Sequence, residues 1–299
     1  MRQSIIDHFK NTVIFKYSLR NDALDIDKSI YSTVDDQCYT LTGDADLSKL
    51  IYNALLDYAF DECEMTGEDY NNLHLEAITQ RMRIEEEDDD ETQGKYGFFG
   101  EVLLNLLLRI IYSTECIITK GVFYDILKPE ELKGYDSFHL VEDTDNLYLW
   151  FGEVKFHQTD DSALKSALEN LEKAISDDYF RKNLLALTPK KRMFNVESPK
   201  MDGIIERIRK NSKVQISSLK SDFGLKLIYP IFIISNTLKD YDKTIKSSVD
   251  HIKKYYSGKN LNIGIDYDLF FIFLPVNCVK TIKTDILQWI DTKQPLTLL

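Results

Sequence analysis

An apolar stretch near the middle of the chain carries two opposite charges. The segment LYLWFGEVKF, residues 147–156, is mostly apolar and aromatic, which is typical of a buried β-strand, yet it contains Glu153 and Lys155. Side chains two positions apart in a strand share a face, so both charges point to the same side as Leu149 and Phe151. Buried charges cost free energy unless they are paired or bound to an ion, so the fold must pair or bind these two.

The residues before this strand are predicted to form its hairpin partner. If DTDN, residues 143–146, is a four-residue loop, Glu142 pairs with Leu147 and the same register sets Asp136 opposite Glu153. The Cβ atoms of directly opposed residues are roughly 4.5 to 5.5 Å apart, so the two carboxylates are close enough to share one divalent ion. The hairpin therefore predicts a metal site that includes both carboxylates.

Mg²⁺ is the ion that we expect between these carboxylates, with Mn²⁺ as a substitute. Two adjacent carboxylates disfavour joint ionisation unless a cation lies between them. Mg²⁺ takes oxygen ligands, usually one or two carboxylates together with waters and substrate phosphates. Such an ion polarises a phosphoryl oxygen and lowers the pKa of a bound water, while the ammonium of Lys155 would orient that water or stabilise charge on the phosphate. This is the chemistry of phosphodiester hydrolysis.

Glu101 is the candidate for a third metal ligand. It lies in FFGEVLLN between large apolar residues, where a desolvated carboxylate is costly unless it is paired or bound to metal. A simpler alternative pairs Glu101 with Lys95 or Arg109. The corresponding alternative for Glu153 and Lys155 is an ion pair on a solvated face of the sheet.

The pattern of apolar residues predicts an α/β protein with a mixed β-sheet flanked by helices. The segment 97–113 is apolar nearly all round and is predicted to be a buried helix. The other elements that we expect are helices at 47–58, 161–175, 176–187 and 241–257, a C-terminal helix ending near Trp289, an extended piece at 116–124, strands at 225–235 and 268–276, and a loop at 188–203.

The charge of the chain is unevenly distributed. The net charge is −12, and it combines an excess of 20 acids over residues 1–189 with an excess of 8 bases over residues 190–299. The acidic run EEEDDDE, residues 85–91, is either a solvated loop or a charged surface that meets a partner or excludes nucleic acid. We divide the chain into an acidic, partly helical N-terminal region, residues 1–92, and a second domain, residues 93–299.

Cysteine spacing and the N-terminal sequence indicate a cytoplasmic protein. The four cysteines lie far apart without a CxxC pair, which argues against a disulfide framework or a structural zinc site. Charges interrupt every apolar run at the N-terminus, so neither a signal peptide nor a membrane span is predicted. His139 and His157 flank the hairpin with a spacing that forms no zinc site, and we interpret both as edge residues.

Basic residues gather after the hairpin. Phosphate affinity comes from many Lys and Arg contacts, so this cluster is the best candidate for binding a DNA backbone, and a solvated or partner-binding face is the alternative. The candidate contacts are Lys165, Lys173, Arg181, Lys182, Lys190, Lys191 and Arg192.

The sequence has a Glu on a predicted helix, then Gly-x-Asp, and then Glu-x-Lys on the following strand. This order of motifs resembles that of the PD-(D/E)xK nuclease superfamily. More narrowly, YGFFGEVLLNLLLR, GYDSFHLVED and LYLWFGEVKFH, in this order, resemble the HamA family, the nuclease subunits of the Hachiman anti-phage defence system, and their AbpA-like relatives. The resemblance is strong over residues 97–186. It assigns the metal-binding acids to Glu101, Asp136 and Glu153 and the catalytic lysine to Lys155.

The resemblance also implies a fold, an activity and a partner. The fold would be a restriction-endonuclease-like core with an acidic helical N-terminal extension. The activity would be Mg²⁺-dependent cleavage of DNA, restrained by a superfamily 2 helicase subunit (HamB) until phage DNA or damage is sensed. Gln158, three positions after Lys155, is a candidate accessory residue, since a Gln there approaches the active site in some related nucleases.

Two other functions remain open, and none of the three includes nucleotide binding by this chain. One alternative is a catalytically silent nuclease fold that docks a helicase, and the other is a stand-alone restriction or repair nuclease. No GxxxxGK[ST] loop is present, so we expect no nucleotide to be bound by this chain and any ATP-driven step to come from another subunit.

Overall fold

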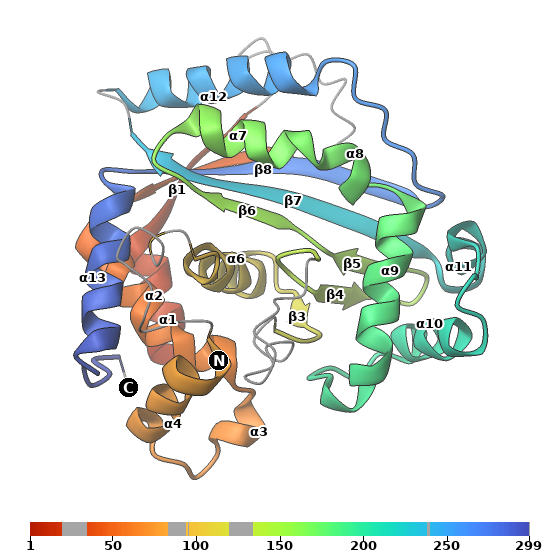
Figure 1. The fold of residues 1–299 in the computed structure, drawn as a ribbon, viewed down its shortest axis with the longest axis horizontal. Helices are drawn as coiled ribbons and strands as arrows, with labels where there is room; N and C mark the ends of the chain where they lie inside the picture. Colours follow the sequence, from red (N-terminus) through yellow and green to blue (C-terminus); the bar gives the residue numbers. More distant parts are fainter. Residues whose placement is uncertain (20–34, 83–93, 95, 120–133, 238–239, 299) are drawn as a thin grey trace.

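A mixed β-sheet runs through the whole structure (Figure 1). The computed structural model describes residues 1–19, 35–82, 94, 96–119, 134–237 and 240–298. Within these residues the sheet has eight strands in the order β1-β2-β8-β7-β5-β4-β3, and β6 pairs with β7 outside this path. The predicted α/β class with a mixed sheet is confirmed.

The centre of the sheet is parallel and its margins are antiparallel. Strands β2, β8, β7 and β5 run parallel to one another, as does β6 beside β7. At the margins, β1 is antiparallel to β2, and β3, β4 and β5 are antiparallel in sequence. Strands β7 and β8 are continuous apolar runs because they are buried on both faces. The strands are β1 (Val13–Leu19), β2 (Asp36–Leu41), β3 (Glu115–Cys116), β4 (His139–Glu142), β5 (Leu147–Trp150), β6 (Glu153–Phe156), β7 (Leu225–Asn236) and β8 (Asp266–Val276).

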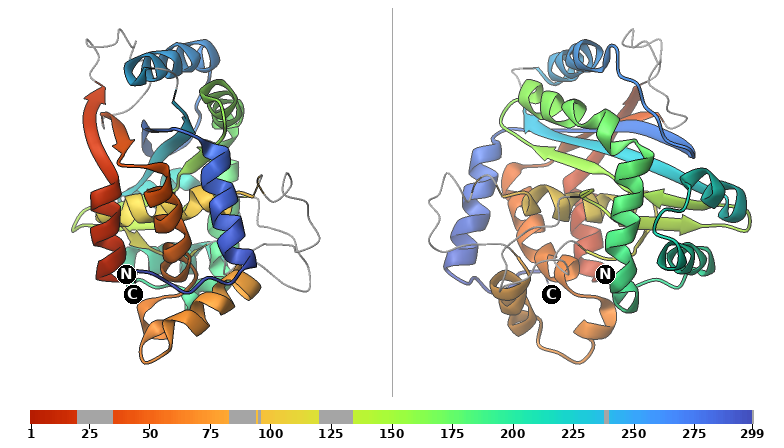
Figure 2. Two further views of the ribbon diagram at one scale, coloured as in Figure 1. Left: turned by 90° about the vertical axis from the view of Figure 1, so that its left-hand side faces the viewer. Right: turned by 45° about the vertical axis from the view of Figure 1, so that its right-hand side comes forward.

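Helices cover both faces of the sheet and form two hydrophobic cores (Figures 1 and 2). One core lies under α1 (Gln3–Thr12), α2 (Asp44–Ala59), α6 (Phe98–Ile111) and α13 (Val279–Asp291), with α3 (Glu62–Met65), α4 (Tyr70–Glu76) and a π-helical turn (Ala77–Arg81) after α2. The other lies under α7 (Asp160–Glu169), α8 (Leu171–Ala174), α9 (Asp177–Leu187), α10 (Pro199–Lys210), α11 (Ile216–Phe223) and α12 (Tyr241–Tyr256).

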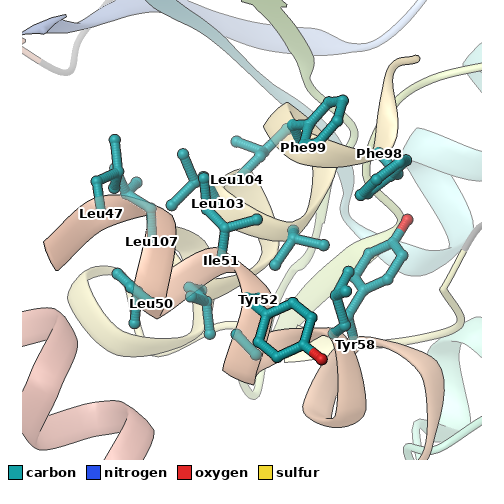
Figure 3. Close-up of a cluster of buried hydrophobic side chains, with 14 of the residues drawn as sticks. Leu47, Leu50, Ile51, Tyr52, Tyr58, Phe98, Phe99, Leu103, Leu104 and Leu107 are labelled. Atoms are coloured by element: carbon teal, nitrogen blue, oxygen red, sulfur yellow. The ribbon is translucent and has the colours of Figure 1, made fainter. Parts of the chain in front are cut away.

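Helix α6 is buried against α2, as its sequence predicts. Figure 3 shows Leu50 and Ile51 of α2 beside Leu103 and Leu107 of α6. All four side chains are at most 1% exposed. This contact fixes α6 against the sheet and thereby places Glu101, which α6 carries.

Side-chain caps set the beginnings of the helices on the other face. Thr159, Ser176 and Ser198 each accept a hydrogen bond from the backbone N–H three residues later, at the starts of α7, α9 and α10. Asp240 accepts two such bonds at the start of α12. These caps satisfy N–H groups that have no partner inside a helix.

Three sequence predictions differ from the structure. The strand expected over 147–156 is divided into β5 and β6, and the helix expected over 161–175 is divided after α7. The loop expected over 188–203 contains a 3-10 helix (Thr188–Met193) and the start of α10, because Ser198 and Pro199 form a favourable helix start that loop-like composition conceals.

The N-terminal region contributes to the same sheet as the rest of the chain. Strands β1 and β2, which the sequence analysis does not predict, join the sheet through β8, and α2 packs into the core shared by β6, β7 and β8. The division at residue 92 stays a prediction. The acidic run 85–91, Lys95 and most of the piece at 116–124 lie outside the described residues. In the described residues no helix is long and apolar enough to cross a membrane.

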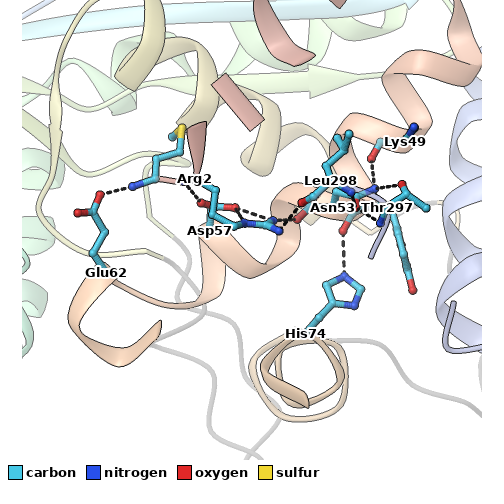
Figure 4. A network of polar contacts seen from close by, with 10 residues as sticks. Arg2, Lys49, Asn53, Asp57, Glu62, His74, Thr297 and Leu298 are labelled. Carbon is cyan, nitrogen blue, oxygen red and sulfur yellow. Dashed lines mark hydrogen bonds and ion pairs between the residues drawn. The ribbon is translucent and has the colours of Figure 1, made fainter. Parts of the chain in front are cut away.

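A buried ion pair ties both ends of the chain to α2 (Figure 4). Arg2 Nε donates to Asp57 Oδ2 at 2.9 Å, and the Arg2 backbone N–H donates to Asp57 Oδ1 at 2.7 Å. A second Arg2 nitrogen donates to the carbonyl of Leu298 at 2.6 Å, while Asn53 Oδ1 accepts from the N–H groups of Thr297 and Leu298. The two ends therefore lie side by side (Figure 2) and hold the last turns of α2.

We expect Arg2→Met to destabilise the protein far more than loss of an exposed ion pair. The substitution leaves the carboxylate of Asp57, whose side chain is 1% exposed, without its cation, at a cost of about 3–5 kcal/mol. Lys182→Met, which removes an exposed contact with Asp178, is the control and should cost much less. Urea unfolding of both variants measures the difference, and equal losses would contradict the assignment.

Candidate active site

The break between β5 and β6 determines where Glu153 and Lys155 lie. The N–H of Gly152 donates to Ser137 Oγ at 2.8 Å, and that hydroxyl donates to the carbonyl of Trp150 at 3.3 Å. A Cβ on Gly152 would lie 2.7 Å from Pro230 Cγ and 2.9 Å from the Pro230 carbonyl oxygen. Only glycine permits this approach to β7, and Glu153 is the first residue of β6 after it.

The hairpin register is confirmed within the strands but not beyond them. Glu142 pairs with Leu147 as predicted, and the ladder ends at His139 opposite Trp150. Asp136 is therefore not the strand partner of Glu153, because the hydroxyl of Ser137 interrupts the backbone ladder. That part of the prediction is wrong.

Asp136 nevertheless lies beside the start of β6. Its N–H donates to the carbonyl of Gly152 at 2.9 Å, and its Oδ2 accepts from the N–H of Val154, also at 2.9 Å. In the described residues β6 pairs only with β7, so this N–H on its other edge is open to a side chain. The Asp136 carboxylate thus approaches the residue next to Glu153 by a side-chain contact rather than by strand pairing.

Glu153 and Lys155 contact each other on β6. Their side chains are 17% and 20% exposed, so the pair is mostly buried and not on a solvated face. The hydroxyl of Tyr229, on β7, donates to Glu153 Oε2 at 3.5 Å. Burial and the charges of Glu153 and then Asp136 raise the pKa of Tyr229 well above its usual value, so its hydroxyl stays a neutral donor.

Glu101 is held by a tyrosine from the N-terminal region. It is 5% exposed on α6, and the hydroxyl of Tyr58 donates to its Oε2 at 2.9 Å. Burial, followed by the charge of Glu101, raises the pKa of Tyr58 well above its usual value. Of the two local partners considered for Glu101, Lys95 lies outside the described residues, and Arg109 instead lies 4.0 Å from Glu62.

The predicted acids lie in one neighbourhood. After burial and the nearer carboxylate, the charge of Asp136 also raises the pKa of both Tyr58 and Tyr229, so Asp136 lies near the Tyr58–Glu101 pair and near the Tyr229–Glu153 pair. We call these five residues the tyrosine–carboxylate row. Lys155 joins the row through Glu153.

The predicted magnesium site has at most two candidate carboxylate ligands in the described residues. Over the described ranges, no group of three His, Cys, Asp or Glu side chains is arranged to hold a metal ion. The chemistry of the donors nevertheless suits Mg²⁺, which accepts one or two carboxylates with waters and substrate phosphates. Asp136, which accepts a hydrogen bond from β6, and Glu153, which begins β6, are the candidates for these two ligands, and Glu101 is held separately by Tyr58.

Sequence reasoning missed the tyrosines that organise this site. Tyr58 and Tyr229 lie in apolar segments, where an aromatic residue indicates core packing, so no sequence signal distinguishes their hydroxyls. Tyr135 precedes Asp136, and its hydroxyl donates to the carbonyl of Ala174 at 2.6 Å. Its ring, 1% exposed, fixes the backbone from which Asp136 projects.

The predicted DNA-contact residues lie on α7, α8, α9 and the 3-10 helix after α9, and most have acidic neighbours. The ammonium of Lys165 is 3.8 Å from Glu169, and that of Lys191 is 3.0 Å from Asp202. Asp178 pairs with both Arg181 and Lys182, at 3.1 and 2.7 Å. The ammonium of Lys173 lies 5.2 Å from the ring centroid of Tyr179. Their DNA contacts stay a prediction, as does a role for Gln158, which is exposed after the end of β6.

The two histidines near the hairpin differ in burial. His139 is 1% exposed and its Nδ1 lies 2.8 Å from the hydroxyl of Thr114, so it is a core residue and its interpretation as an edge residue is wrong. Burial lowers the pKa of His139 to about 3. His157 follows β6, is half-buried, and its N–H donates to the carbonyl of Ile234.

Comparison with known families covers nearly the whole chain. A family model described as HamA matches residues 7–290 of the 299. A search of curated proteins finds no match. The matched span contains the tyrosine–carboxylate row and Lys155, so the family describes the part of the chain that forms the candidate site.

We expect Gly152→Ala to destabilise the protein by about 1–3 kcal/mol, because the new methyl group meets the backbone of Pro230. Gly43→Ala is the control, since its nearest neighbour would be a side-chain oxygen of Asp46 at 3.6 Å, an ordinary contact. The free energy of unfolding in urea measures both variants. A loss no larger at Gly152 than at Gly43 would contradict the close approach.

The burial of His139 predicts a pH dependence of stability. Its pKa is about 3 in the folded protein against 6.5 for an ordinary histidine, so below pH 6.5 the unfolded chain binds a proton that the folded one does not. The contribution of His139 to the free energy of unfolding is fully present above pH 6.5. It falls by at most about 1.4 kcal/mol per pH unit as the pH is lowered toward 3. His139→Gln should remove this part of the slope in urea unfolding, and parallel curves would show that the residue titrates normally.

Proposed function

This chain belongs to the HamA family, whose members are components of the Hachiman anti-phage defence system, and we propose that it is a metal-dependent DNA endonuclease. The observation that carries the proposal is the arrangement at β6. Glu153 and Lys155 are in contact and mostly buried, and the carboxylate of Asp136 accepts from the intervening residue, Val154. Two acids beside a lysine, with Glu153 and Lys155 on one strand and Asp136 contacting that strand, suit phosphodiester hydrolysis.

Each residue of the site has a role in this proposal. Asp136 and Glu153 would hold Mg²⁺ or Mn²⁺, which when bound polarises the phosphate and lowers the pKa of a water. Lys155 orients the attacking water or stabilises charge on the phosphate, and its contact with Glu153 holds it there. Tyr229 would hold Glu153 in place by donating a hydrogen bond to its Oε2.

Glu101 would support the site from α6 without being one of the two proposed metal ligands. The hydrogen bond from the hydroxyl of Tyr58 holds this buried carboxylate in place. Without a third ligand in place, waters and substrate phosphate oxygens would fill the remaining positions around Mg²⁺. Substrate binding would then complete the metal coordination.

We assign the regulation of this nuclease to a second subunit. Family membership supports a place in a defence complex. The sequence has no phosphate-binding GxxxxGK[ST] loop, so an ATP-driven step would come from a separate chain, for which we propose a superfamily 2 helicase (HamB-like). In this proposal the helicase restrains the nuclease until phage DNA or damage is sensed. The strong negative charge of the chain supports a partner that supplies part of the DNA contact.

One observation favours a second function, a silent nuclease fold that docks the helicase. Over the described ranges three metal ligands are not assembled, and the contact of Lys155 with Glu153 would then be a structural ion pair. The two functions differ in whether Glu153 and Lys155 are needed for DNA cleavage.

We expect Glu153→Gln and Lys155→Met each to lower plasmid cleavage by about a hundredfold or more. Supercoiled plasmid is incubated with the protein and Mg²⁺, Mn²⁺ or EDTA, alone and with the helicase subunit. The matched control is Glu206→Gln with Lys210→Met, which alters an exposed Glu–Lys contact on α10. Full cleavage by both site variants would refute the proposal, and no metal-stimulated cleavage by wild type, alone or with the helicase, would favour the silent module.

A further inference from the structure

Three tyrosines, Tyr135, Tyr179 and Tyr229, form a cluster beside the candidate site, which we call the tyrosine cluster. The ring centroid of Tyr135 lies 5.9 Å from that of Tyr229 and 5.0 Å from that of Tyr179. The hydroxyl of Tyr229 donates to Glu153. The cluster therefore connects Tyr179, on α9, to the first residue of β6.

The cluster lies on the same side of the sheet as Glu153 and Lys155. These two residues pair with Ile231 and Ile233 of β7, whose side chains belong to the core under α7 to α12. Side chains of directly paired residues lie on one face of a sheet. The same core contains the tyrosine cluster, with Tyr179 at its margin.

The tyrosine cluster reaches the surface at Tyr179. Tyr135 and Tyr229 are each 1% exposed, whereas Tyr179 is half-buried. Lys173, on α8, is exposed, and its ammonium lies 5.2 Å from the ring centroid of Tyr179. A lysine ammonium at this distance is attracted to the face of a tyrosine ring. The cluster thus ends at the surface in an aromatic ring that carries a cation.

The ring of Tyr179 is held in a defined position. The N–H of Tyr179 donates to the hydroxyl of Ser176, which caps α9, at 3.4 Å. Its ring meets that of Tyr135 edge to face, at an interplanar angle of 82°, which is a preferred arrangement of aromatic pairs. A cation that rests on a fixed ring loses less conformational entropy when it binds a ligand.

The acidic residues nearest to Lys173 in the sequence contact other groups. Glu172 and Asp177 each accept a hydrogen bond from a backbone N–H in the segment before β8, and Asp178 pairs with two cations of α9. Several of the basic residues predicted to contact DNA pair with carboxylates. Lys173 instead contacts the tyrosine cluster, and through it lies beside the candidate site.

We propose that Lys173, positioned by the ring of Tyr179, binds a backbone phosphate of the nucleic acid strand that enters the candidate site. This inference rests on the proposed nuclease function, which places the cleaved phosphate at Glu153 and Lys155. A phosphate contact supplies affinity and fixes the strand without reading its base sequence. Tyr179 is then a positioning residue that the sequence analysis does not identify.

The test is the affinity of the full chain for a short fluorescein-labelled DNA duplex in EDTA, measured by fluorescence anisotropy across a salt series. Lys173→Met removes the charge and keeps a long side chain. We expect the slope of log affinity against log salt to fall in magnitude by about 0.9, the value for one lost phosphate contact. Lys173→Arg keeps the charge and should retain the wild-type slope. Thermal unfolding confirms that each variant is folded.

A double-mutant cycle tests the role of Tyr179. Tyr179→Leu removes the ring and should weaken binding, whereas Tyr179→Phe keeps the ring and should bind the duplex as the wild type does. Because the ring acts through Lys173, the double variant with Lys173→Met and Tyr179→Leu should bind no more weakly than Lys173→Met alone. Losses that add in the double variant would overturn the positioning role.

The matched control is a second lysine–tyrosine pair, on α12. The ammonium of Lys254 lies 4.6 Å from the ring centroid of Tyr255, whose hydroxyl donates to Asp161 and not to the tyrosine cluster. Lys254→Met and Tyr255→Leu should leave the slope unchanged. A folded Lys173→Met variant with the wild-type slope would overturn the proposal. An equal fall in slope for Lys254→Met, or a wild type that does not bind the duplex at low salt, would also overturn it.

The binding assay contains no active metal, so its result separates from that of the cleavage assay. A slope that depends on Lys173 in a protein that does not cleave would leave the phosphate contact in place on a silent nuclease fold. Cleavage that requires Glu153, with a slope independent of Lys173, would leave the nuclease in place and remove the contact.

Discussion

The close approach of Gly152 to Pro230 determines how the candidate site forms. A side chain at Gly152 would meet the backbone and ring of Pro230, so this is the point where the interrupted strand turns against β7. The turn ends the pairing of β4 with β5 and leaves one edge of β6 open, and the carboxylate of Asp136 occupies that edge at Val154. Because β7 pairs with both β5 and β6, the sheet stays continuous while one edge of β6 is left to a side chain.

Buried tyrosines allow acidic side chains to gather at this edge. Neutral hydroxyls from Tyr58 and Tyr229 contact Glu101 and Glu153 from elements far apart in the sequence. Burial and the neighbouring carboxylates raise the pKa of both tyrosines, so neither competes for a proton or a cation near neutral pH. The hydrogen bonds hold the carboxylates without cancelling their charge, and that charge is what a divalent cation would bind.

Patterns within short segments predict much of this structure. Apolar periodicity identifies α2, α6, β7 and β8, and the hairpin loop fixes the pairing of Glu142 with Leu147. The break at Gly152 depends on Pro230, nearly eighty residues later, and the hydroxyl of Tyr58 finds Glu101 only when α2 packs on α6. Such contacts leave no periodic signal. A glycine or an aromatic residue in an apolar run looks the same in the sequence whether it only fills the core or also makes a specific contact with a distant residue.

The N-terminal region has a direct part in the candidate site. Tyr58 is in the last turns of α2, next to Asp57, and Asp57 is fixed by its ion pair with Arg2. Arg2 in turn binds the carbonyl of Leu298, so the same contact that closes the chain also holds the turn that supports Glu101. Movement of α2 would shift Tyr58 and weaken its hydrogen bond to Glu101, while Asp136 and Glu153, held by β6 and β7, would stay in place. The N-terminal region therefore supports the third acid of the candidate site, while the sheet supports the other two independently.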